Sequence, residues 1–225
     1  MSNIKLYYIT IATLPHPILE NLQKKITKNN ERIEVLGLDE NRQIGWEDKG
    51  NFGIKLKEVK NFVFNDKLKD EDIVLMTDGF DVIYAGNKDT LIKRYYEFNS
   101  PIVFGCETQC HPDKNMAQYY QNKDKEFPYL NSGMYIGKVW ALKKCLKNYV
   151  YEDKHDDQLY WTHTYFNNPD LIALDYDNKL FLNSEGIEWD KLTWNMDTEY
   201  LTYKDKNPLF LHINGPDKTI IRKFL

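Results

Sequence analysis

The sequence predicts an α/β fold with a mostly parallel central sheet flanked by helices. In the first half of the chain, segments rich in β-branched and aromatic residues alternate with segments whose apolar residues recur at helical spacing. The run IVLMT at residues 73–77 is almost entirely apolar, which is typical of a strand buried on both faces of a parallel sheet. The length of 225 residues accommodates one such core, so we expect a single domain over residues 1–225.

The expected elements follow one another regularly through the first half. Helical spacing is clearest where Ile54, Val59 and Phe62 fall near one face of a helix. Asp89 and Thr90 can cap the next helix, over LIKRYYEF. We expect strands at residues 4–13, 32–38, 73–77 and 101–106, and helices at residues 17–28, 52–64 and 91–98.

The second half is less regular. It predicts a strand near residues 129–137, helices near 140–151 and 156–166, and a last strand at 208–213. Its sequence shows no internal repeat and no low-complexity linker.

Composition narrows the class of protein. The net charge is −4 with both signs interspersed, so no nucleic-acid-binding surface is expected. No stretch approaches the roughly 20 apolar residues of a membrane span. The odd set Cys106, Cys110 and Cys145 disfavours a disulfide framework and a zinc site. The first residues lack a secretory signal pattern, so we expect a cytoplasmic protein rather than one of the endoplasmic reticulum lumen.

Two carboxylates follow the strand at residues 73–77. Ligands of open α/β sheets bind outside the carboxyl ends of the strands. Asp78 and Asp81 stand at such an end, and Gly79 permits a tight turn between them. Two carboxylates on one turn can share Mg²⁺ or Mn²⁺, which prefer oxygen ligands. The alternative is an ordinary polar turn.

A second polar group follows the last predicted strand. His212 stands at the strand end, Asn214 and Gly215 form the turn after it, and Lys218 follows. Histidine is a good Mn²⁺ ligand, and lysine is a mobile positive charge suited to phosphate. The alternative is a structural histidine.

With these motifs the chain resembles glycosyltransferases of the GT-A fold. More specifically, it is similar to the glycosyltransferase domain of the procollagen lysyl hydroxylases, here as a stand-alone chain. The blocks that carry the resemblance appear in order along the chain: YYITIAT, VLGLDE, IVLMTDGFDVIYAG, VFGCET, YLNSGMYIG, KHDDQLYW, ALDYDNKLFLN and LHINGPDK.

The resemblance implies a donor site for a UDP-sugar with Mn²⁺ as cofactor. It assigns the metal to Asp78, Asp81 and His212, and the phosphates to Lys218. Residues 1–106 would form the nucleotide-sugar-binding half and 107–225 the acceptor-side half. The family's ribose-side tryptophan aligns with Arg42 if no gap is allowed, and the nearby Trp46 is the alternative residue for that contact. The other residues implied at the donor are Thr10, Thr13, Lys55, Phe80 (against the uracil), Asn214 and Gly215.

On the acceptor side the resemblance implies that Asp156 and Asp157 are catalytic. Crowded carboxylates can orient an acceptor hydroxyl or stabilise an oxocarbenium-like centre. Without the resemblance, the same residues read as a charged helix start with Asp156 as N-cap. Asn131 and Glu107 are further catalytic candidates at strand ends. Asn131 equally suits a turn, and Glu107 a surface ion pair.

The resemblance implies transfer of glucose from UDP-glucose to galactosyl-hydroxylysine of collagen or a collagen-like chain, with retention of configuration. Galactosyl transfer to hydroxylysine is an alternative. A UDP-sugar-binding protein without transfer is another, because the loop TQCHPDKNM has His111 and lacks the family's aromatic residue. A metal-dependent phosphohydrolase is a third. The family often dimerises, so a homodimer is also implied.

Overall fold

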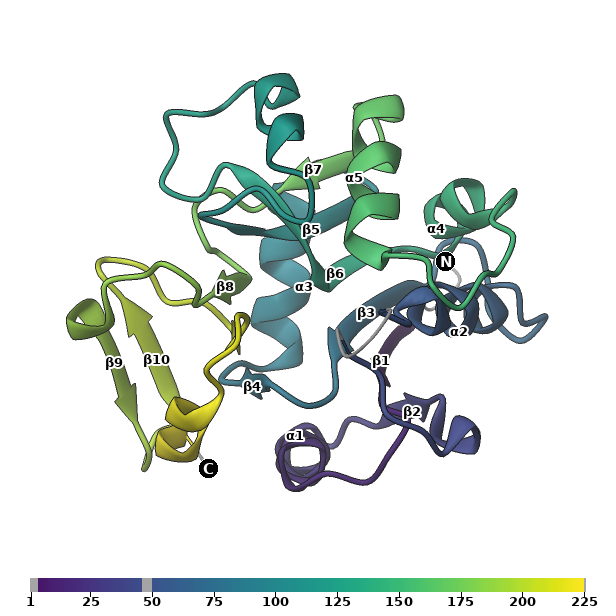
Figure 1. The fold of residues 1–225 in the computed structure, drawn as a ribbon. Helices are drawn as coiled ribbons and strands as arrows, with labels where there is room; N and C mark the ends of the chain where they lie inside the picture. Colours follow the sequence, from purple (N-terminus) through teal and green to yellow (C-terminus); the bar gives the residue numbers. More distant parts are fainter. Residues whose placement is uncertain (1–3, 46–49, 225) are drawn as a thin grey trace.

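The computed structural model describes residues 4–45 and 50–224, and it confirms the mostly parallel α/β fold. The central sheet has six strands (Figure 1), in which β6 runs antiparallel to both its neighbours and the other strands share one direction. In spatial order the strands are β2 (Ile33–Leu36), β1 (Leu6–Ile11), β3 (Ile73–Asp78), β6 (Tyr129–Lys138), β5 (Ile102–Glu107) and β7 (Ile172–Leu174).

Helices cover both faces of this sheet, so successive strand side chains enter different cores. Ile9 and Met76 pack with α2, α4 and α5, whereas Tyr8 and Leu75 pack with α1 and α3. The helices are α1 (Pro17–Lys28), α2 (Gly53–Val63), α3 (Lys88–Glu97), α4 (Val139–Leu146) and α5 (Asp157–Asn167). This burial on both faces explains the apolar runs along the strands.

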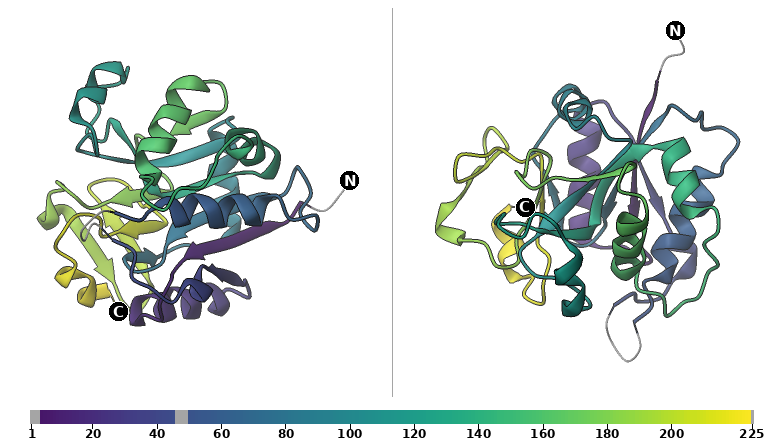
Figure 2. Two further views of the ribbon diagram at one scale, coloured as in Figure 1. Left: turned by 45° about the vertical axis from the view of Figure 1, so that its right-hand side comes forward. Right: turned by 90° about the horizontal axis from the view of Figure 1, so that it is seen from above.

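Two smaller sheets complete the fold. One joins β4 (Val82–Tyr84), β11 (Phe210–His212) and β8 (Phe181–Asn183), with β11 in the middle. The other is the hairpin of β9 (Leu192–Asn195) and β10 (Tyr200–Tyr203), which lies at the opposite end of the molecule from α2 and α4 (Figures 1 and 2).

The structure corrects several predicted boundaries. Helix α3 begins at Lys88 because Asn87 is its N-cap and accepts a hydrogen bond from Thr90 N at 3.0 Å, so the prediction that Asp89 and Thr90 cap it was wrong. Helix α4 ends at Leu146, not near residue 151, and the chain then runs beside α2, where Lys60 Nζ donates to the Tyr149 carbonyl at 2.7 Å. The strands that were not predicted (β4, β7, β8, β9 and β10) have three or four residues each, too few to show a period.

The strand ends converge on one edge. The carboxyl ends of β1, β3 and β5 meet there, together with the amino end of the antiparallel β6. The small sheet joins the same edge, because His212 of β11 pairs in register with Asn183 of β8 and with Val82 of β4. Among the described residues, no helix is both long and apolar enough to cross a membrane.

Candidate active site

Asp78 and Asp81 lie on either side of a tight turn. Asp78 is the last residue of β3, and Asp81 immediately precedes β4. Gly79 lies so close to β1 that a Cβ there would come within 2.7 Å of the Ile11 carbonyl oxygen. Only glycine therefore lets the turn fold back against β1 and bring both carboxylates to one side.

The orientation of His212 is set by an amide in the neighbouring strand. Asn183 Nδ2 donates to the Cys106 carbonyl at 2.8 Å, which leaves Asn183 Oδ1 facing His212 Nδ1 at 2.8 Å. Nδ1 must therefore carry a hydrogen, and in the neutral imidazole Nε2 presents a lone pair on its other side.

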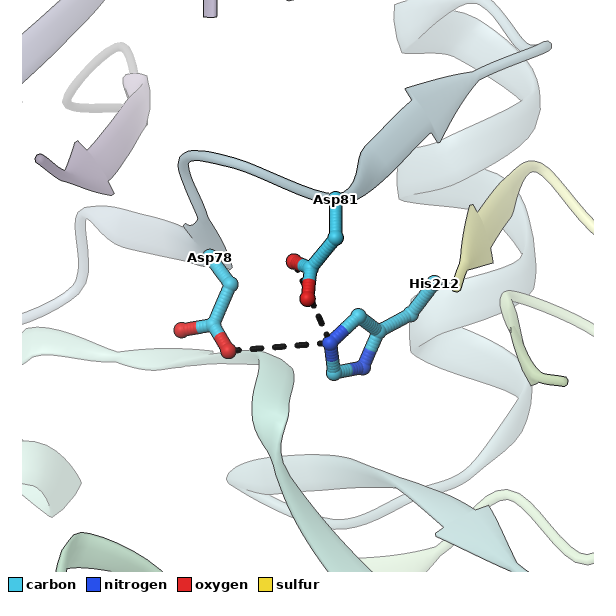
Figure 3. A group of neighbouring side chains, drawn as sticks. All are labelled: Asp78, Asp81 and His212. Atoms are coloured by element: carbon cyan, nitrogen blue, oxygen red, sulfur yellow. Dashed lines mark ion pairs between the residues drawn. The ribbon is translucent and has the colours of Figure 1, made fainter. Parts of the chain in front are cut away.

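That lone pair points at the two carboxylates (Figure 3). His212 Nε2 lies 3.6 Å from Asp78 Oδ2 and 3.3 Å from Asp81 Oδ1. The three ligand atoms lie within 4.8 Å of one another. Three acceptors facing one another repel unless a cation, or a proton on Nε2, lies between them. Two carboxylates and an imidazole are the donor set that suits Mn²⁺, so the residues fit the predicted metal.

Gly133 leaves the space that His212 occupies. A Cβ at this position of β6 would lie 2.3 Å from His212 Cε1 and 3.0 Å from Asp78 Oδ2. Real side chains do not approach so closely, so any residue other than glycine must displace the imidazole. Gly133 belongs to the site although it carries no side chain.

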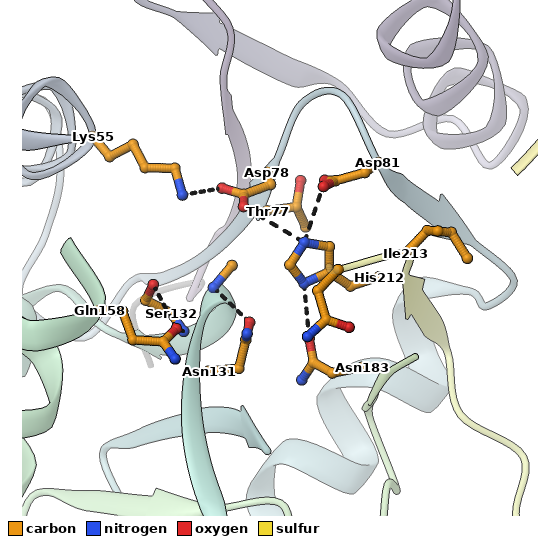
Figure 4. A network of polar contacts seen from close by, with 12 residues as sticks. Lys55, Thr77, Asp78, Asp81, Asn131, Ser132, Gln158, Asn183, His212 and Ile213 are labelled. Atoms are coloured by element: carbon orange, nitrogen blue, oxygen red, sulfur yellow. Dashed lines mark hydrogen bonds and ion pairs between the residues drawn. The ribbon is translucent and has the colours of Figure 1, made fainter. Parts of the chain in front are cut away.

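Lys55 links the predicted metal ligands to the predicted catalytic carboxylate. Its Nζ lies 2.7 Å from Asp78 Oδ1 (Figure 4). The same Nζ lies 3.2 Å from Asp157 Oδ2. Burial alone would lower the pKa of Lys55, but the carboxylates of Asp157 and Asp78 outweigh it and raise that pKa. The ammonium is therefore charged, and losing one partner of such a buried pair costs about 3–5 kcal/mol.

Asp157 has a second partner on β6. Ser132 Oγ donates to Asp157 Oδ2 at 2.8 Å, and Asp157 is itself buried. The carboxylate is thus held from two sides at the edge of the predicted metal site. This arrangement suits a group that must keep one orientation.

Lys218 lies against the other metal ligand. Its Nζ donates to Asp81 Oδ2 at 2.6 Å and also to the Ile213 carbonyl. Burial alone would raise the pKa of Asp81, but its interactions with His212 and with the ammonium of Lys218 hold that pKa well below its usual range. The Lys218 side chain is 42% exposed, so its ammonium can also reach an anion outside the protein.

Glu107 is the centre of a second polar cluster. It accepts hydrogen bonds from Asn131 Nδ2 at 3.1 Å and Asn214 Nδ2 at 3.0 Å, and from Gln158 Nε2. Burial raises the pKa of Glu107 to about 8, and the amide donors oppose that shift. Glu107 is 2% exposed, so the expectation of a surface ion pair was wrong.

Two other acceptor-side candidates have structural partners. Asp156 is the N-cap of α5 and accepts from Leu159 N at 2.8 Å. Asn131 Oδ1 accepts from Gly133 N at 2.9 Å within its own strand. The N-cap expected for Asp156 is confirmed, whereas Asn131 lies within strand β6, so the alternative of a turn residue was wrong. A catalytic role for either residue stays a prediction.

The remaining donor-side predictions lie around the end of β1. Thr10 and Thr13 are buried, and Thr10 Oγ1 donates to the Thr77 carbonyl at 2.9 Å. The Phe80 ring lies beside His16, with ring centroids 5.2 Å apart. Trp46 lies outside the described residues, and Arg42 is engaged elsewhere, as described below.

Asn214 and Gly215 continue the turn after β11. Asn214 Oδ1 accepts from Glu185 N at 2.8 Å, and Gly215 has φ +89°, a conformation that favours glycine. Nucleotide contacts by Thr10, Thr13, Phe80, Asn214 and Gly215 stay predictions.

Four site residues had no individual role in the sequence analysis. They are Ser132, Gly133, Gln158 and Asn183, which orient Asp157, His212 or Glu107 through the contacts described above. All four fall inside the blocks LNSG, HDDQLYW and KLFLN that carry the resemblance. Their partners are 25 or more residues away in the sequence, so no local pattern indicated them.

The PLOD GT domain family matches residues 2–224, and the chain belongs to that family. The α/β architecture with a mostly parallel sheet, predicted together with the GT-A resemblance, is confirmed. Membership makes the chain a glycosyltransferase-family protein, and the Asp78, Asp81 and His212 group is compatible with a metal site.

Curated relatives match almost the whole chain. The multifunctional procollagen lysine hydroxylase and glycosyltransferase of Caenorhabditis elegans is 30% identical over 96% of this chain and 31% of its own length. The human multifunctional procollagen lysine hydroxylase and glycosyltransferase LH3 is 27% identical over 95% of this chain and 30% of its own length. The chain thus spans about a third of the curated relatives it matches.

Solved structures resemble the chain more distantly. A197 from STIV has 11% identity and a TM-score of 0.45, with 96% of this chain and 100% of that chain covered. A putative glucose-1-phosphate thymidylyltransferase from Bacillus anthracis has 10% identity and a TM-score of 0.43, with 76% and 86% covered.

Proposed function

We propose that this member of the PLOD GT domain family is an Mn²⁺-dependent hexosyltransferase. It transfers glucose from UDP-glucose to galactosyl-hydroxylysine of collagen or a collagen-like protein. The observation that carries this proposal is the convergence of three acceptor atoms, from Asp78, Asp81 and His212, beside the buried carboxylate of Asp157. Family membership supports the reaction class.

Asp78, Asp81 and His212 would hold the cation. A bound divalent cation would neutralise the negative charge that develops on the leaving diphosphate. Lys218 is placed to add a positive charge on the same side, because its exposed ammonium already lies against Asp81. The nucleotide would lie along the end of β1, next to Phe80, which can stack on a base.

The transfer breaks the bond from the sugar C1 to the diphosphate oxygen and forms a bond from C1 to the acceptor oxygen. The acceptor hydroxyl gives up its proton, which the departing diphosphate oxygen can accept, so the products are the glycosylated acceptor and UDP. Asp157 and Asp156 are the carboxylates we assign to the acceptor side, where they orient the hydroxyl or stabilise positive charge at C1. Lys55 and Ser132 hold Asp157 in place. Retention of configuration is implied by the resemblance to GT-A glycosyltransferases, several retaining members of which have the His-x-x-Gly-x-x-Lys spacing of His212, Gly215 and Lys218.

The direct test is transfer from a panel of UDP-sugars, with Mn²⁺ or EDTA, to a deglucosylated collagen peptide that carries galactosyl-hydroxylysine. We expect a mass gain of one hexose from UDP-glucose alone, abolished by EDTA. A gain from UDP-galactose on hydroxylysine peptide would instead indicate a galactosyltransferase. Mn²⁺-dependent UDP binding without any gain would favour a binding-only protein.

A phosphohydrolase would cleave the nucleotide sugar at a rate that does not depend on the acceptor. Measuring UDP release with and without acceptor peptide distinguishes this case, because we expect the acceptor to accelerate release. Slow release without acceptor is compatible with a transferase that also transfers the sugar to water.

The implied homodimer and the expected cytoplasmic location stay predictions. Sedimentation of the purified chain tests the homodimer.

A further inference from the structure

The loop that follows β2 and the loop that precedes α5 meet in a two-pronged ion pair. Arg42 Nη1 donates to Asp153 Oδ2 at 2.8 Å, and Arg42 Nη2 donates to Asp153 Oδ1 at 2.6 Å. The two residues are 111 positions apart in the sequence. Parallel donation from a planar guanidinium to a carboxylate is the strongest and most directional form of ion pair.

Three neighbours close this pair into a ring. Arg42 Nε lies 3.0 Å from Glu40 Oε2, and Lys57 Nζ lies 2.7 Å from Glu40 Oε1. Lys57 Nζ also lies 5.3 Å from the centre of the Tyr151 ring, and Tyr151 OH donates to Asp153 Oδ1 at 2.8 Å. We call these five residues the Arg42 clamp. Its two cations and two carboxylates balance, so it has no net charge to attract a ligand.

Within the Arg42 clamp, the guanidinium has few hydrogen-bond donors left for a nucleotide. Nε faces Glu40, and both terminal nitrogens donate to Asp153. The position where the family's tryptophan aligns is thus occupied by a side chain turned toward the protein. Arg42 can therefore affect transfer only through the residues that it contacts.

The Arg42 clamp holds the loop that precedes α5. Gly53 N donates to the Asp153 carbonyl at 3.1 Å, and a Cβ on Gly53 would lie 2.0 Å from the Glu152 carbonyl oxygen. The loop therefore lies directly on the first turn of α2. Lys55 is in that turn, and Asp157 comes four residues after Asp153. Lys55 Nζ and Asp157 Oδ2 therefore meet beside the loop, 3.2 Å apart.

We propose that Arg42 is a positioning residue for hexosyl transfer. By gripping Asp153 it fixes the loop that leads into α5, so that Asp157 meets Lys55 in one orientation. The inference rests on the proposed function of Asp157, and its structural part can be tested without it. Small displacements of a reacting group lower rates steeply, so we expect the loss of this partly exposed pair to affect the rate more than the stability.

The experiment compares R42A, R42K, D153A and the R42A/D153A double variant with the wild type. We expect each alanine variant to lower kcat about tenfold, with the Kd of UDP plus Mn²⁺ changed less than about twofold. The double variant should lose no more than either single one, because each residue acts through the other. R42K keeps the charge without the fork, so it should recover only part of kcat.

The matched control is K143A, which removes an exposed ion pair with Asp70 of 3.0 Å at another site. It should leave kcat unchanged. Additive losses in the double variant, or a loss of UDP affinity that parallels kcat, would overturn the inference. So would a fall in melting temperature large enough to account for the lost activity.

Hydrogen exchange provides a readout that does not depend on transfer. Amides at residues 151–158 should exchange faster in R42A and D153A and remain unchanged in K143A. If the wild type transfers no hexose from any donor, the proposed function fails, but faster exchange would still support the clamp. Unchanged exchange in R42A would overturn it whatever the activity.

Discussion

Two polar clusters at the same edge of the sheet differ in how fully they are satisfied. Around Glu107, three amide groups donate to one buried carboxylate. Around His212, acceptors from Asp78 and Asp81 face a third acceptor, and Asp81 Oδ1 has no hydrogen-bond donor among the described residues. The first cluster is complete by itself, whereas the second needs a cation or a proton between its acceptor atoms. Unsatisfied buried groups thus indicate ligand sites better than the mere presence of carboxylates does.

The largest expected effect separates catalysis from donor binding. Asp157→Asn keeps the shape of the side chain and removes its charge beside Lys55. We expect transfer to fall by about 10²–10⁴-fold, while Mn²⁺-dependent UDP binding stays nearly intact. Kinetics with the acceptor peptide and calorimetry with UDP measure the two quantities. Unchanged transfer would return Asp157 to a structural helix start, and D70N, at a side chain 69% exposed, is the control.

The next effect tests the unsatisfied cluster itself. Asp81→Ala removes a metal ligand and the partner of Lys218. We expect Mn²⁺-dependent UDP affinity to fall more than about 100-fold, since even residues that only orient ligands cost 10–100-fold. Titration calorimetry with and without EDTA measures this, with D70A as the control. Affinity that survives the substitution would remove Asp81 from the metal site.

A smaller effect is expected from the residue that only provides space. Gly133→Ala places a Cβ 2.3 Å from His212 Cε1, so the imidazole must turn away from the carboxylates. We expect Mn²⁺ affinity to fall about 10–100-fold. Gly45→Ala is the matched control, because a Cβ there meets nothing within 4 Å. Equal affinities in the two variants would show that the imidazole does not ligate the metal.

The smallest effect concerns the satisfied cluster and appears in stability. The pKa of Glu107 is raised from 4.5 to about 8 in the folded protein, so the folded state binds more protons than the unfolded state between these values. The free energy of unfolding should therefore decrease as pH rises from about 4.5 to about 8.

Glu107→Gln cannot ionise, so it should lose less stability over this range, with a difference on the order of a few kcal/mol, because each pH unit between the two pKa values contributes about 1.4 kcal/mol. Urea denaturation at pH 5, 6.5 and 8 checks the sign. A wild type that gains stability relative to the variant as pH rises would contradict the raised pKa.

Local sequence patterns predicted the site residues that follow the ends of strands. Asp78, Asp81 and His212 follow apolar runs, and the topology brings such ends to one edge. Their supports could not be predicted in the same way. Asn183 meets His212 from a three-residue strand too short to recognise, and Arg42 meets Asp153 across 111 residues. Such contacts depend on tertiary packing, which local spacing does not encode.

The fold shows the same division. Long elements with a clear period, such as α1 and β3, were predicted close to their observed bounds. The end of α4 was predicted near residue 151 but lies at Leu146, and the contact that holds the following chain against α2 comes from Lys60, 89 residues from Tyr149 in the sequence.

The most direct test is anomalous diffraction at the manganese edge from a crystal grown with Mn²⁺ and UDP. We predict a manganese peak bound by Asp78, Asp81 and His212 Nε2, next to the diphosphate. UDP bound with no manganese at these three side chains would contradict it.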